Sequence, residues 1–258
     1  MTKNYYGKLL SSPAVNYKAK KNIKLNVHTY YLSLAHSDLS GYNVCPLANK
    51  ITAKENNKNK SNCSAVCVAS NGNGRYPNVI NSRINKTKRF FEDRKNFLND
   101  LVEDITKAVL YSEHYEFIPT FRLNAYSDIK WENIKIKSMG NKTIFELFPD
   151  VQFYDYTKIP NRVTPVNYSL TYSHFGKMDI TKDQINKGYN VAMVFDSQKN
   201  DDLPTKHNGI KVIDGDKTDL RTNENDGINV IVGLRAKMSK ANIQNELNKN
   251  ISFIVRGA

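Results

Sequence analysis

Short β-like runs recur through the second half of this 258-residue chain, and their regular return constrains the fold more than any other feature. The runs occupy residues 117–123, 151–156, 168–172, 190–195, 210–213, 228–233 and 251–255. Helical or mixed segments separate several of them, at residues 129–136, 143–148, 181–187 and 239–248. Strands that alternate with such connections are typical of a mostly parallel α/β sheet. Because the connections after residues 156, 195 and 213 are short for full helical crossovers, we expect an incomplete or decorated TIM-like barrel.

The chain is long enough to bury a substantial core, and we interpret residues 1–258 as a single α/β domain. Alternation at residues 26–34 predicts a strand, and residues 41–82 have the irregular composition of a loop that carries the cysteines. Apolar spacing at 83–112 predicts an amphipathic basic helix, either one long helix or two abutting ones. The repeated strand–connection units then fill residues 117–256.

Polar residues directly follow most of the predicted strands. The carboxyl ends of strands line the ligand site in barrels and open α/β sheets, so we expect these side chains to converge on one pocket. The residues assigned to catalysis are Asp128, Asp155, Lys158, His174, Asp214 and Asp216. The residues assigned to substrate binding are Arg122, Asn124, Arg235 and Lys237. Asp, Asn and Ser residues after strands also serve as turn and helix-cap residues, so each position has a structural explanation as well.

Three cysteines, Cys45, Cys63 and Cys67, are the only ones in the chain, and all lie in the predicted loop. Three thiolates are one too few for a closed structural zinc site, and they suit a metal or cluster with an open position. An odd cysteine count and a polar N-terminal segment argue against a disulfide framework, so we expect reduced thiols and a cytoplasmic location in the host cell. Two alternatives are a zinc site completed by His36 and three unligated cysteines packed in the loop.

The chain carries a formal net charge of +13, which favours an acidic partner, most simply nucleic acid. The residues assigned to nucleic-acid binding are Arg83, Lys86, Lys88 and Arg89. They alternate with Phe90 and Phe91 in a pattern that would place a basic stripe over a buried aromatic ridge. Lysine and asparagine enrichment at solvated positions is also what an AT-rich genome produces, so the charge has a compositional explanation too.

Several strings resemble an uncharacterised family of phage- and plasmid-encoded proteins with a three-cysteine loop. They are GYNVCP (41–46), CSAVC (63–67), KTKRFF (86–91), RLNAYSDIKW (122–131), FPDVQFYDYTK (148–158) and VIDGD (212–216). That family is similar in outline to radical-SAM enzymes, in which a cysteine-bearing loop precedes an α/β barrel. The resemblance implies a [4Fe–4S] cluster on the three cysteines, S-adenosylmethionine as a further ligand, and an enzyme acting on nucleic acid or a nucleotide. Ser70 stands where the usual third cysteine would be, so Cys45 must complete the trio.

Two other classes of function stay open. A divalent-metal-dependent nuclease would hold Mg²⁺ with Asp128, Asp155, Asp214 and Asp216 and would stabilise a phosphate transition state with a basic side chain. A non-catalytic protein would bind nucleic acid or a host protein through the basic helix and the tyrosines of residues 30–31 and 154–156. His174 could serve an enzyme as a general acid or base, because the unperturbed pKa of histidine lies near neutrality. No stretch has the length of apolar sequence that a membrane span requires, so no membrane partner is expected.

Overall fold

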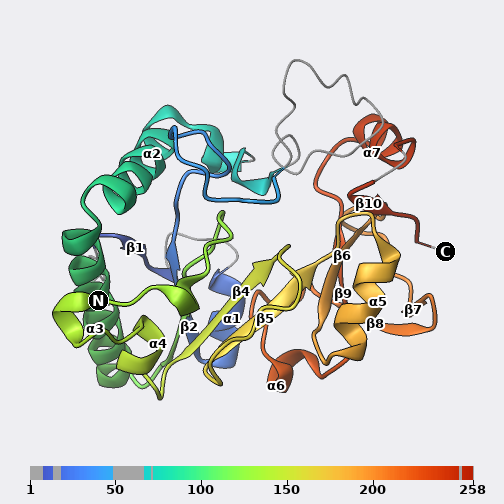
Figure 1. Cartoon of the computed structure of the whole chain (residues 1–258). Coiled ribbons are helices and arrows are strands. Elements are labelled where there is room, and N and C mark those ends of the chain that lie inside the picture. The colour runs from blue at the N-terminus through green and yellow to red at the C-terminus, as the bar shows by residue number, and fades with distance from the viewer. Residues whose placement is uncertain (1–7, 14–18, 49–66, 71, 250–251, 258) are drawn as a thin grey trace. The chain divides into compact units, whose positions relative to one another are not determined.

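The computed structural model describes residues 8–13, 19–48, 67–70, 72–249 and 252–257. The chain divides into two compact units, labelled by their helices and strands in Figure 1. The first unit comprises Met1–Pro46, Cys67–Asp155 and Val163–Ser169, and the second comprises Leu47–Val66, Tyr156–Arg162 and Leu170–Ala258. Each unit has its own parallel strands and its own helices. The interpretation of residues 1–258 as one domain stays a prediction.

The first unit is built on strands in the order β1-β2-β3-β4. They are β1 (Leu10–Ser11), β2 (Val27–Leu32), β3 (Ile118–Arg122) and the first residues of β4 (Gln152–Thr157). The short β1 is antiparallel to β2, whereas β2, β3 and β4 run parallel. Thr29 pairs with Thr120 in this register, and Phe121 pairs with Phe153. The predicted strands at 26–34, 117–123 and 151–156 therefore exist and lie side by side.

The helices of the first unit connect and flank these strands. They are α1 (Ala19–Asn22), η2 (Ile23–Leu25), η3 (Val68–Ser70), η4 (Gly72–Arg75), α2 (Pro77–Glu92), α3 (Arg94–His114), η5 (Trp131–Asn133), η6 (Lys137–Met139) and α4 (Ile144–Leu147). The predicted helical segment at 83–112 forms α2 and α3, which meet at Asp93 (Figure 1). Proline at the first position of α2 is favourable, because its missing N–H has no partner there in any helix.

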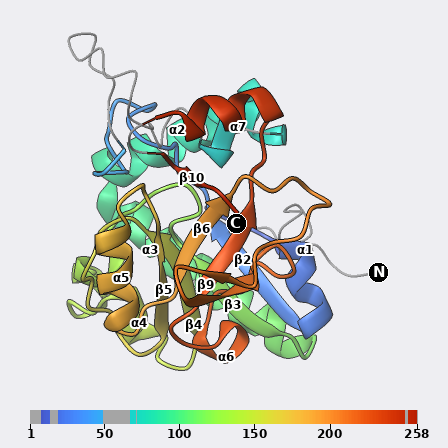
Figure 2. The ribbon, with the colours of Figure 1, turned by 90° about the vertical axis from the view of Figure 1, so that its right-hand side faces the viewer.

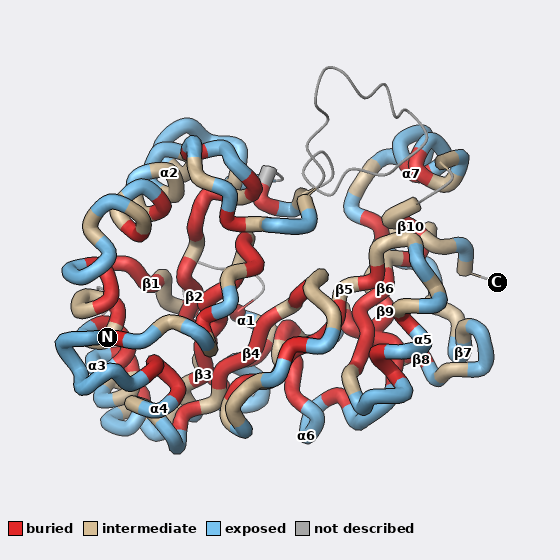
Figure 3. Tube along the Cα trace, in the orientation of Figure 1, coloured by how far each residue is buried: buried red, intermediate tan, exposed pale blue. Residues whose placement is uncertain are grey.

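The helix α3 covers β3 with one apolar face. Residues spaced three and four apart along this face are buried, and they are Phe97, Leu98, Leu101, Ile105 and Ala108. Figure 3 shows the exposed outer surfaces of α2 and α3 in pale blue against the buried strands in red. None of the helices among the described residues combines the length and the apolar character that crossing a membrane requires.

Three tyrosines that were candidates for base stacking lie instead in the core of the first unit. Tyr30, Tyr31 and Tyr154 have 0%, 1% and 0% of their surface exposed. The hydroxyl of Tyr154 bonds Thr29 at 3.0 Å inside a buried network that also includes Thr120. These rings therefore present no free face to a nucleobase. The interpretation of Tyr30, Tyr31 and Tyr154 as base-stacking residues is wrong.

The second unit has strands in the order β5-β6-β9-β8-β7, with β10 beside the end of β6. They are the last residues of β5 (Tyr168–Ser173), then β6 (Val191–Phe195), β7 (Lys206–His207), β8 (Ile210–Asp214), β9 (Ile231–Arg235) and β10 (Ile254–Val255). All are parallel to their neighbours except β7, which is antiparallel to β8. Helices α5 (Met178–Asn186), α6 (Asn223–Asp226) and α7 (Lys240–Leu247) complete this unit (Figure 2).

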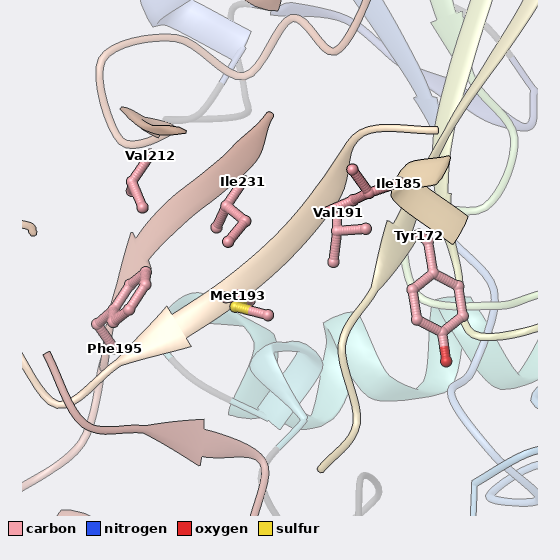
Figure 4. Packing of buried hydrophobic residues seen from close by; sticks show 7 residues of the cluster. All are labelled: Tyr172, Ile185, Val191, Met193, Phe195, Val212 and Ile231. Carbon is pink, nitrogen blue, oxygen red and sulfur yellow. The ribbon is translucent and has the colours of Figure 1, made fainter. Parts of the chain in front are cut away.

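Strands β6, β8 and β9 and the helix α5 share one apolar core. Its members are Tyr172, Ile185, Val191, Met193, Phe195, Val212 and Ile231 (Figure 4). A second, smaller core forms where α7 packs Ile243 against Ile254 and Ala236. Because β10 pairs with Val194 and Phe195, this smaller core lies at the carboxyl end of β6.

The strands form open sheets, so the predicted incomplete or decorated TIM-like barrel is wrong, while the mostly parallel character is confirmed. In the first unit β1 is an antiparallel edge strand, and in the second β7 is another. Asn208 and Gly209 join β7 to β8 with φ angles of 50° and 79°, the left-handed values of a tight hairpin turn. This hairpin occupies part of the connection after residue 195, so the shortness of that connection reflects an added edge strand and not a missing barrel helix.

Candidate functional site

A buried carboxylate organises the chain where it leaves β3 in the first unit. Asp155 is 0% exposed, and its Oδ2 accepts hydrogen bonds from the backbone N–H groups of Leu123 at 3.1 Å and Asn124 at 3.0 Å. The hydroxyl of Tyr168 donates to the same oxygen at 3.2 Å. The other oxygen lies 3.6 Å from Nε of Arg122, which is also buried. Two predicted site residues, Arg122 and Asp155, thus form a buried ion pair.

The side chain of Asn124 shapes the loop that follows β3. Its Oδ1 accepts hydrogen bonds from the Ser127 hydroxyl at 2.8 Å, the Ile129 N–H at 2.9 Å and the Trp131 indole N–H at 3.2 Å. Its Nδ2 donates to the Ile129 carbonyl at 2.9 Å and to the Tyr168 hydroxyl at 3.3 Å. The Nδ2 donors and the Oδ1 acceptor of Asn124 are therefore all used in hydrogen bonds within the protein, which indicates a structural role for this side chain.

Asp214, Asp216, Arg235 and Lys237 come together at the carboxyl ends of β8 and β9 in the second unit. The guanidinium of Arg235 binds both oxygens of Asp214, at 2.9 and 3.1 Å, and lies 3.4 Å from Oδ2 of Asp216. Lys237 lies 3.6 Å from the other oxygen of Asp216. Burial raises the pKa of Asp214, but hydrogen bonds from Arg235 and from the Asp216 N–H outweigh it and hold that pKa below its usual value. Both carboxylates are paired with cationic side chains.

Lys158 and His174 also lie in the second unit, where β4 and β5 end. The ammonium of Lys158 donates to the Ser173 hydroxyl at 2.8 Å and lies 5.0 Å from the ring centroids of Phe175 and Phe253. This lysine is thus held by a hydroxyl and by two cation–π contacts.

His174 has both ring nitrogens engaged. The Gly176 N–H donates to Nε2 at 3.1 Å, so the proton of the neutral ring is on Nδ1, which bonds the Thr181 hydroxyl at 2.7 Å. Burial, followed by the charge of Lys158, lowers the pKa of His174 to about 4. The neutral ring, with a hydrogen bond at each nitrogen, connects the end of β5 to Gly176 and to Thr181 of α5. The acid–base role of His174 stays a prediction.

The four aspartates of the nuclease hypothesis do not form one cluster within either unit. Asp128 and Asp155 belong to the first unit, and Asp214 and Asp216 belong to the second. One carboxylate of each pair accepts hydrogen bonds within the protein. Asp155 accepts them from backbone N–H groups, and Asp214 accepts them from Arg235. No group of three or more His, Cys, Asp or Glu side chains in the described ranges is placed to hold a metal ion. The magnesium-dependent nuclease therefore stays a prediction.

The three-cysteine site is not covered by that observation, because Cys63 lies outside the described residues. Cys45 and Cys67 are described, and both are half-buried. The Sγ atom of Cys45 accepts from the Ser37 N–H at 3.4 Å and donates to the Tyr126 carbonyl at 3.5 Å. Ser37 follows β2 and Tyr126 follows the parallel neighbour β3, so Cys45 lies at the carboxyl ends of both strands.

Arg83 of α2 connects this position to the segment that carries Cys67. Its Nη1 donates to the carbonyl of Ala69, two residues after Cys67, at 2.9 Å. Its guanidinium carbon lies 4.2 Å from the ring centroid of Tyr126, the residue whose carbonyl meets Cys45. Burial, followed by the charge of Arg83, lowers the pKa of His36, so this candidate zinc ligand is neutral at pH 7. Sequence reasoning did not link Arg83 or Tyr126 to the cysteines, because they meet only through tertiary packing.

A comparison with family models identifies the relatives of the chain. The model described as gene product 88 matches residues 5–250, which is nearly the whole length. The chain belongs to the gene product 88 family. Searches of curated proteins and of solved structures found no match. The expected membership of a phage-type family is therefore confirmed, while the likeness to radical-SAM enzymes stays a prediction.

The basic side chains of α2 in this gene product 88 family member are mostly used within the protein. Lys86 donates to the Leu9 carbonyl at 2.7 Å, and burial lowers its pKa. Arg89 pairs with Asp100 at 2.5 Å, and Arg83 makes the contacts given above. Lys88 alone among the four residues assigned to nucleic-acid binding is exposed. The predicted stripe is thus interrupted, and nucleic-acid binding through α2 stays a prediction.

Proposed function

We propose that Cys45, Cys63 and Cys67 hold a metal–thiolate centre, most simply an iron–sulfur cluster. The observation that carries this proposal is the meeting of Cys45 with the Cys67-bearing segment around Arg83 and Tyr126. In open α/β sheets, ligand sites lie beyond the carboxyl ends of the strands. Two of the three thiol-bearing segments converge at that position.

Metal ions bind the thiolate form of cysteine, which accepts hydrogen bonds. The Ser37 N–H already points at the sulfur of Cys45, and the cationic Arg83 stacks on the residue that contacts the thiol. Soft thiolate donors suit iron and zinc better than magnesium. The donor set therefore fits the group that the sequence predicts.

Three thiolates leave one position of a [4Fe–4S] cluster without a protein ligand. Held by Cys45, Cys63 and Cys67, such a cluster would supply electrons and would bind S-adenosylmethionine as a further ligand. The net charge of +13 favours nucleic acid or a nucleotide as the substrate of such an enzyme. The alternative is a zinc site closed by His36, whose neutral imidazole is the ligating form.

Anaerobic purification followed by iron, zinc and sulfide analysis and an absorption spectrum tests the proposal. We expect iron and sulfide in the wild-type protein and their loss in the variants Cys45→Ser, Cys63→Ser and Cys67→Ser. Ser70→Ala, in the same segment but without a thiol, is the matched control and should keep the metal. Stoichiometric zinc would support the closed site instead. A protein that binds neither metal after reconstitution under reducing conditions would overturn the proposal.

A further inference from the structure

Two aromatic rings from distant parts of the chain stack on each other in the first unit, where α2 ends. The rings of Tyr42 and Phe91 are nearly parallel, with an interplanar angle of 6° and centroids 4.4 Å apart. Phe91 belongs to α2, and Tyr42 belongs to the loop after β2. Both side chains are only half-buried, so each keeps part of its surface exposed. Tyr42 and Phe91 thus build an aromatic platform.

Hydrogen bonds fix the orientation of Tyr42. Its hydroxyl donates to Oε1 of Glu92 at 3.0 Å, and its backbone N–H donates to the Ser40 hydroxyl at 3.3 Å. The residue before it, Gly41, has a φ angle of 91°, which residues with a side chain rarely adopt. A ring that is already held in place loses little conformational entropy when a flat ligand stacks on it.

The hydrophobic core supports the platform from below. Phe90 is 1% exposed, and its ring meets that of Phe91 at 87° with centroids 5.1 Å apart. Phe90 also contacts the rings of Phe97 and Trp131. The platform is therefore backed by packed aromatic side chains.

Arg94, the first residue of α3, adds a cation beside the platform (Figure 1). Its guanidinium carbon lies 4.4 Å from the ring centroid of Phe90 and 5.7 Å from that of Phe91. Its Nε donates to the Phe90 carbonyl at 3.3 Å, and its other N–H groups have no acceptor among the described residues. This exposed guanidinium thus keeps donors that can bind an anion.

Lys88 provides a second exposed cation at the same place. It precedes Phe91 by three residues in α2, so the two side chains lie on the same side of the helix. Within the part of the chain that the structure describes, neither Lys88 nor Arg94 forms an ion pair, whereas the neighbouring Arg89 pairs with two carboxylates. The platform is therefore flanked by positive charge that the protein itself does not neutralise.

This combination narrows the chemistry of a partner. An aromatic face binds flat rings, and cations beside it bind phosphate groups. Single-stranded nucleic acid offers both, because its bases are unpaired and alternate with phosphates. Duplex DNA keeps the faces of its bases stacked on one another, and an acidic protein segment offers carboxylates without bases. The net charge of +13 adds a long-range attraction to the same class of partner.

We propose that single-stranded nucleic acid binds at this platform, with one base stacked on the face of Tyr42 that points away from Phe91 and with phosphates contacting Lys88 and Arg94. The site requires no metal, so it goes beyond the metal–thiolate centre. It also differs from the basic stripe predicted from the sequence, because Lys86 and Arg89 are used within the protein and the stacking ring comes from another segment.

Fluorescence anisotropy with a labelled oligothymidine tests this on the whole chain, reduced and with a chelator present. We expect Tyr42→Leu, which keeps an apolar side chain and loses the ring, to weaken binding by about 5- to 100-fold. Tyr42→Phe keeps the ring and should bind like the wild type. Circular dichroism checks that both variants are folded.

The salt dependence of the same titration tests the phosphate contacts. Lys88→Gln should lower the slope of log affinity against log salt concentration by about 0.7, the value for one phosphate contact on a single strand. Lys137→Gln, which removes an exposed charge from η6 of the same unit, is the matched control and should keep the wild-type slope.

An abasic oligonucleotide of the same length tests the stacking on the wild-type protein, without any substitution. We expect it to bind more weakly than oligothymidine by a factor similar to that of Tyr42→Leu. Equal affinity for the abasic oligomer or for polyglutamate would overturn the proposal, and so would a wild-type protein that binds no oligothymidine. The iron and zinc contents that test the metal–thiolate centre are a separate readout, so the failure of one proposal leaves the other untouched.

Discussion

The carboxylate of Asp155 and the guanidinium of Arg122 form an ion pair with an Oδ1–Nε distance of 3.6 Å, and both side chains are almost fully buried. Arg122 is the last residue of β3, and Asp155 lies in its parallel neighbour β4. The guanidinium also stacks 5.5 Å from the ring centroid of Tyr31 and 5.6 Å from that of Tyr154. This pair fixes the point at which the chain leaves β3 and turns toward Cys45.

Removing the Asp155 carboxylate should therefore destabilise the first unit. Asp155→Ala leaves the Arg122 charge buried and deprives two backbone N–H groups of their acceptor, so we expect the free energy of unfolding to fall by about 3–5 kcal/mol. Urea unfolding followed by circular dichroism measures this. Asp150→Ala, at an exposed position just before β4, is the control and should change the free energy by less than about 0.5 kcal/mol. Equal stability of the two variants would contradict the structural role of the pair.

His174 should make the stability of the protein sensitive to acid. Burial, then Lys158, holds its pKa at about 4 against an ordinary 6.5, so the unfolded chain binds a proton more readily than the folded one. Stabilisation is then complete above the unfolded pKa and is lost as the pH falls through 6.5 toward about 4. We expect the free energy of unfolding to fall by about 2 kcal/mol between pH 7 and pH 5 through this residue.

Urea unfolding at the two pH values checks the contribution of His174. The variant His174→Gln should lose this part of the pH dependence, whereas His114→Gln, which replaces an exposed histidine on α3, should retain it. If His174→Gln kept the wild-type dependence, the residue could not be buried in its neutral form.

Asp104 of α3 should stabilise the position of strand β1. Its carboxylate is 0% exposed and accepts from the backbone N–H groups of Lys8, Leu9 and Leu10 at 2.7–3.0 Å. We expect Asp104→Ala to raise the amide hydrogen exchange rate of Leu9 and Leu10 by about tenfold or more, because buried N–H groups lose their acceptor. Glu113→Ala, an exposed acid on the same helix, should leave these rates unchanged. Unchanged exchange in Asp104→Ala would show that β1 is held by its pairing with β2 alone.

Much of the strand content was predictable, because a buried strand needs a run of apolar residues at neighbouring positions in the sequence. The predicted runs at 117–123, 168–172 and 190–195 coincide closely with β3, β5 and β6. The Asn208–Gly209 turn also has a local signal, since this dipeptide favours a tight hairpin. The connection after residue 195 therefore contains a β-hairpin and not a crossover of a barrel.

The roles of the polar residues were less predictable, because a charged side chain takes its role from the partner that another strand supplies. Asp155 and Asp214 both follow the expected pattern near strand ends, yet Arg122 and Arg235 on neighbouring strands neutralise them. Asn124 was expected to contact a substrate, and its donors and acceptor are used by its own loop. Electrostatic partners of this kind lie far apart in the chain, so residue order alone does not reveal them.

The amino-acid sequence by itself determined the mostly parallel α/β character, since strand-forming runs and the connections between them follow from local patterns. Only the tertiary structure decided that the sheets stay open and that Cys45 and the Cys67 segment meet at Tyr126 and Arg83. The physical reason is that α2 is fixed by the hydrogen bond between Thr87 and Ala35, a contact that exists only after β2 and α2 have packed together.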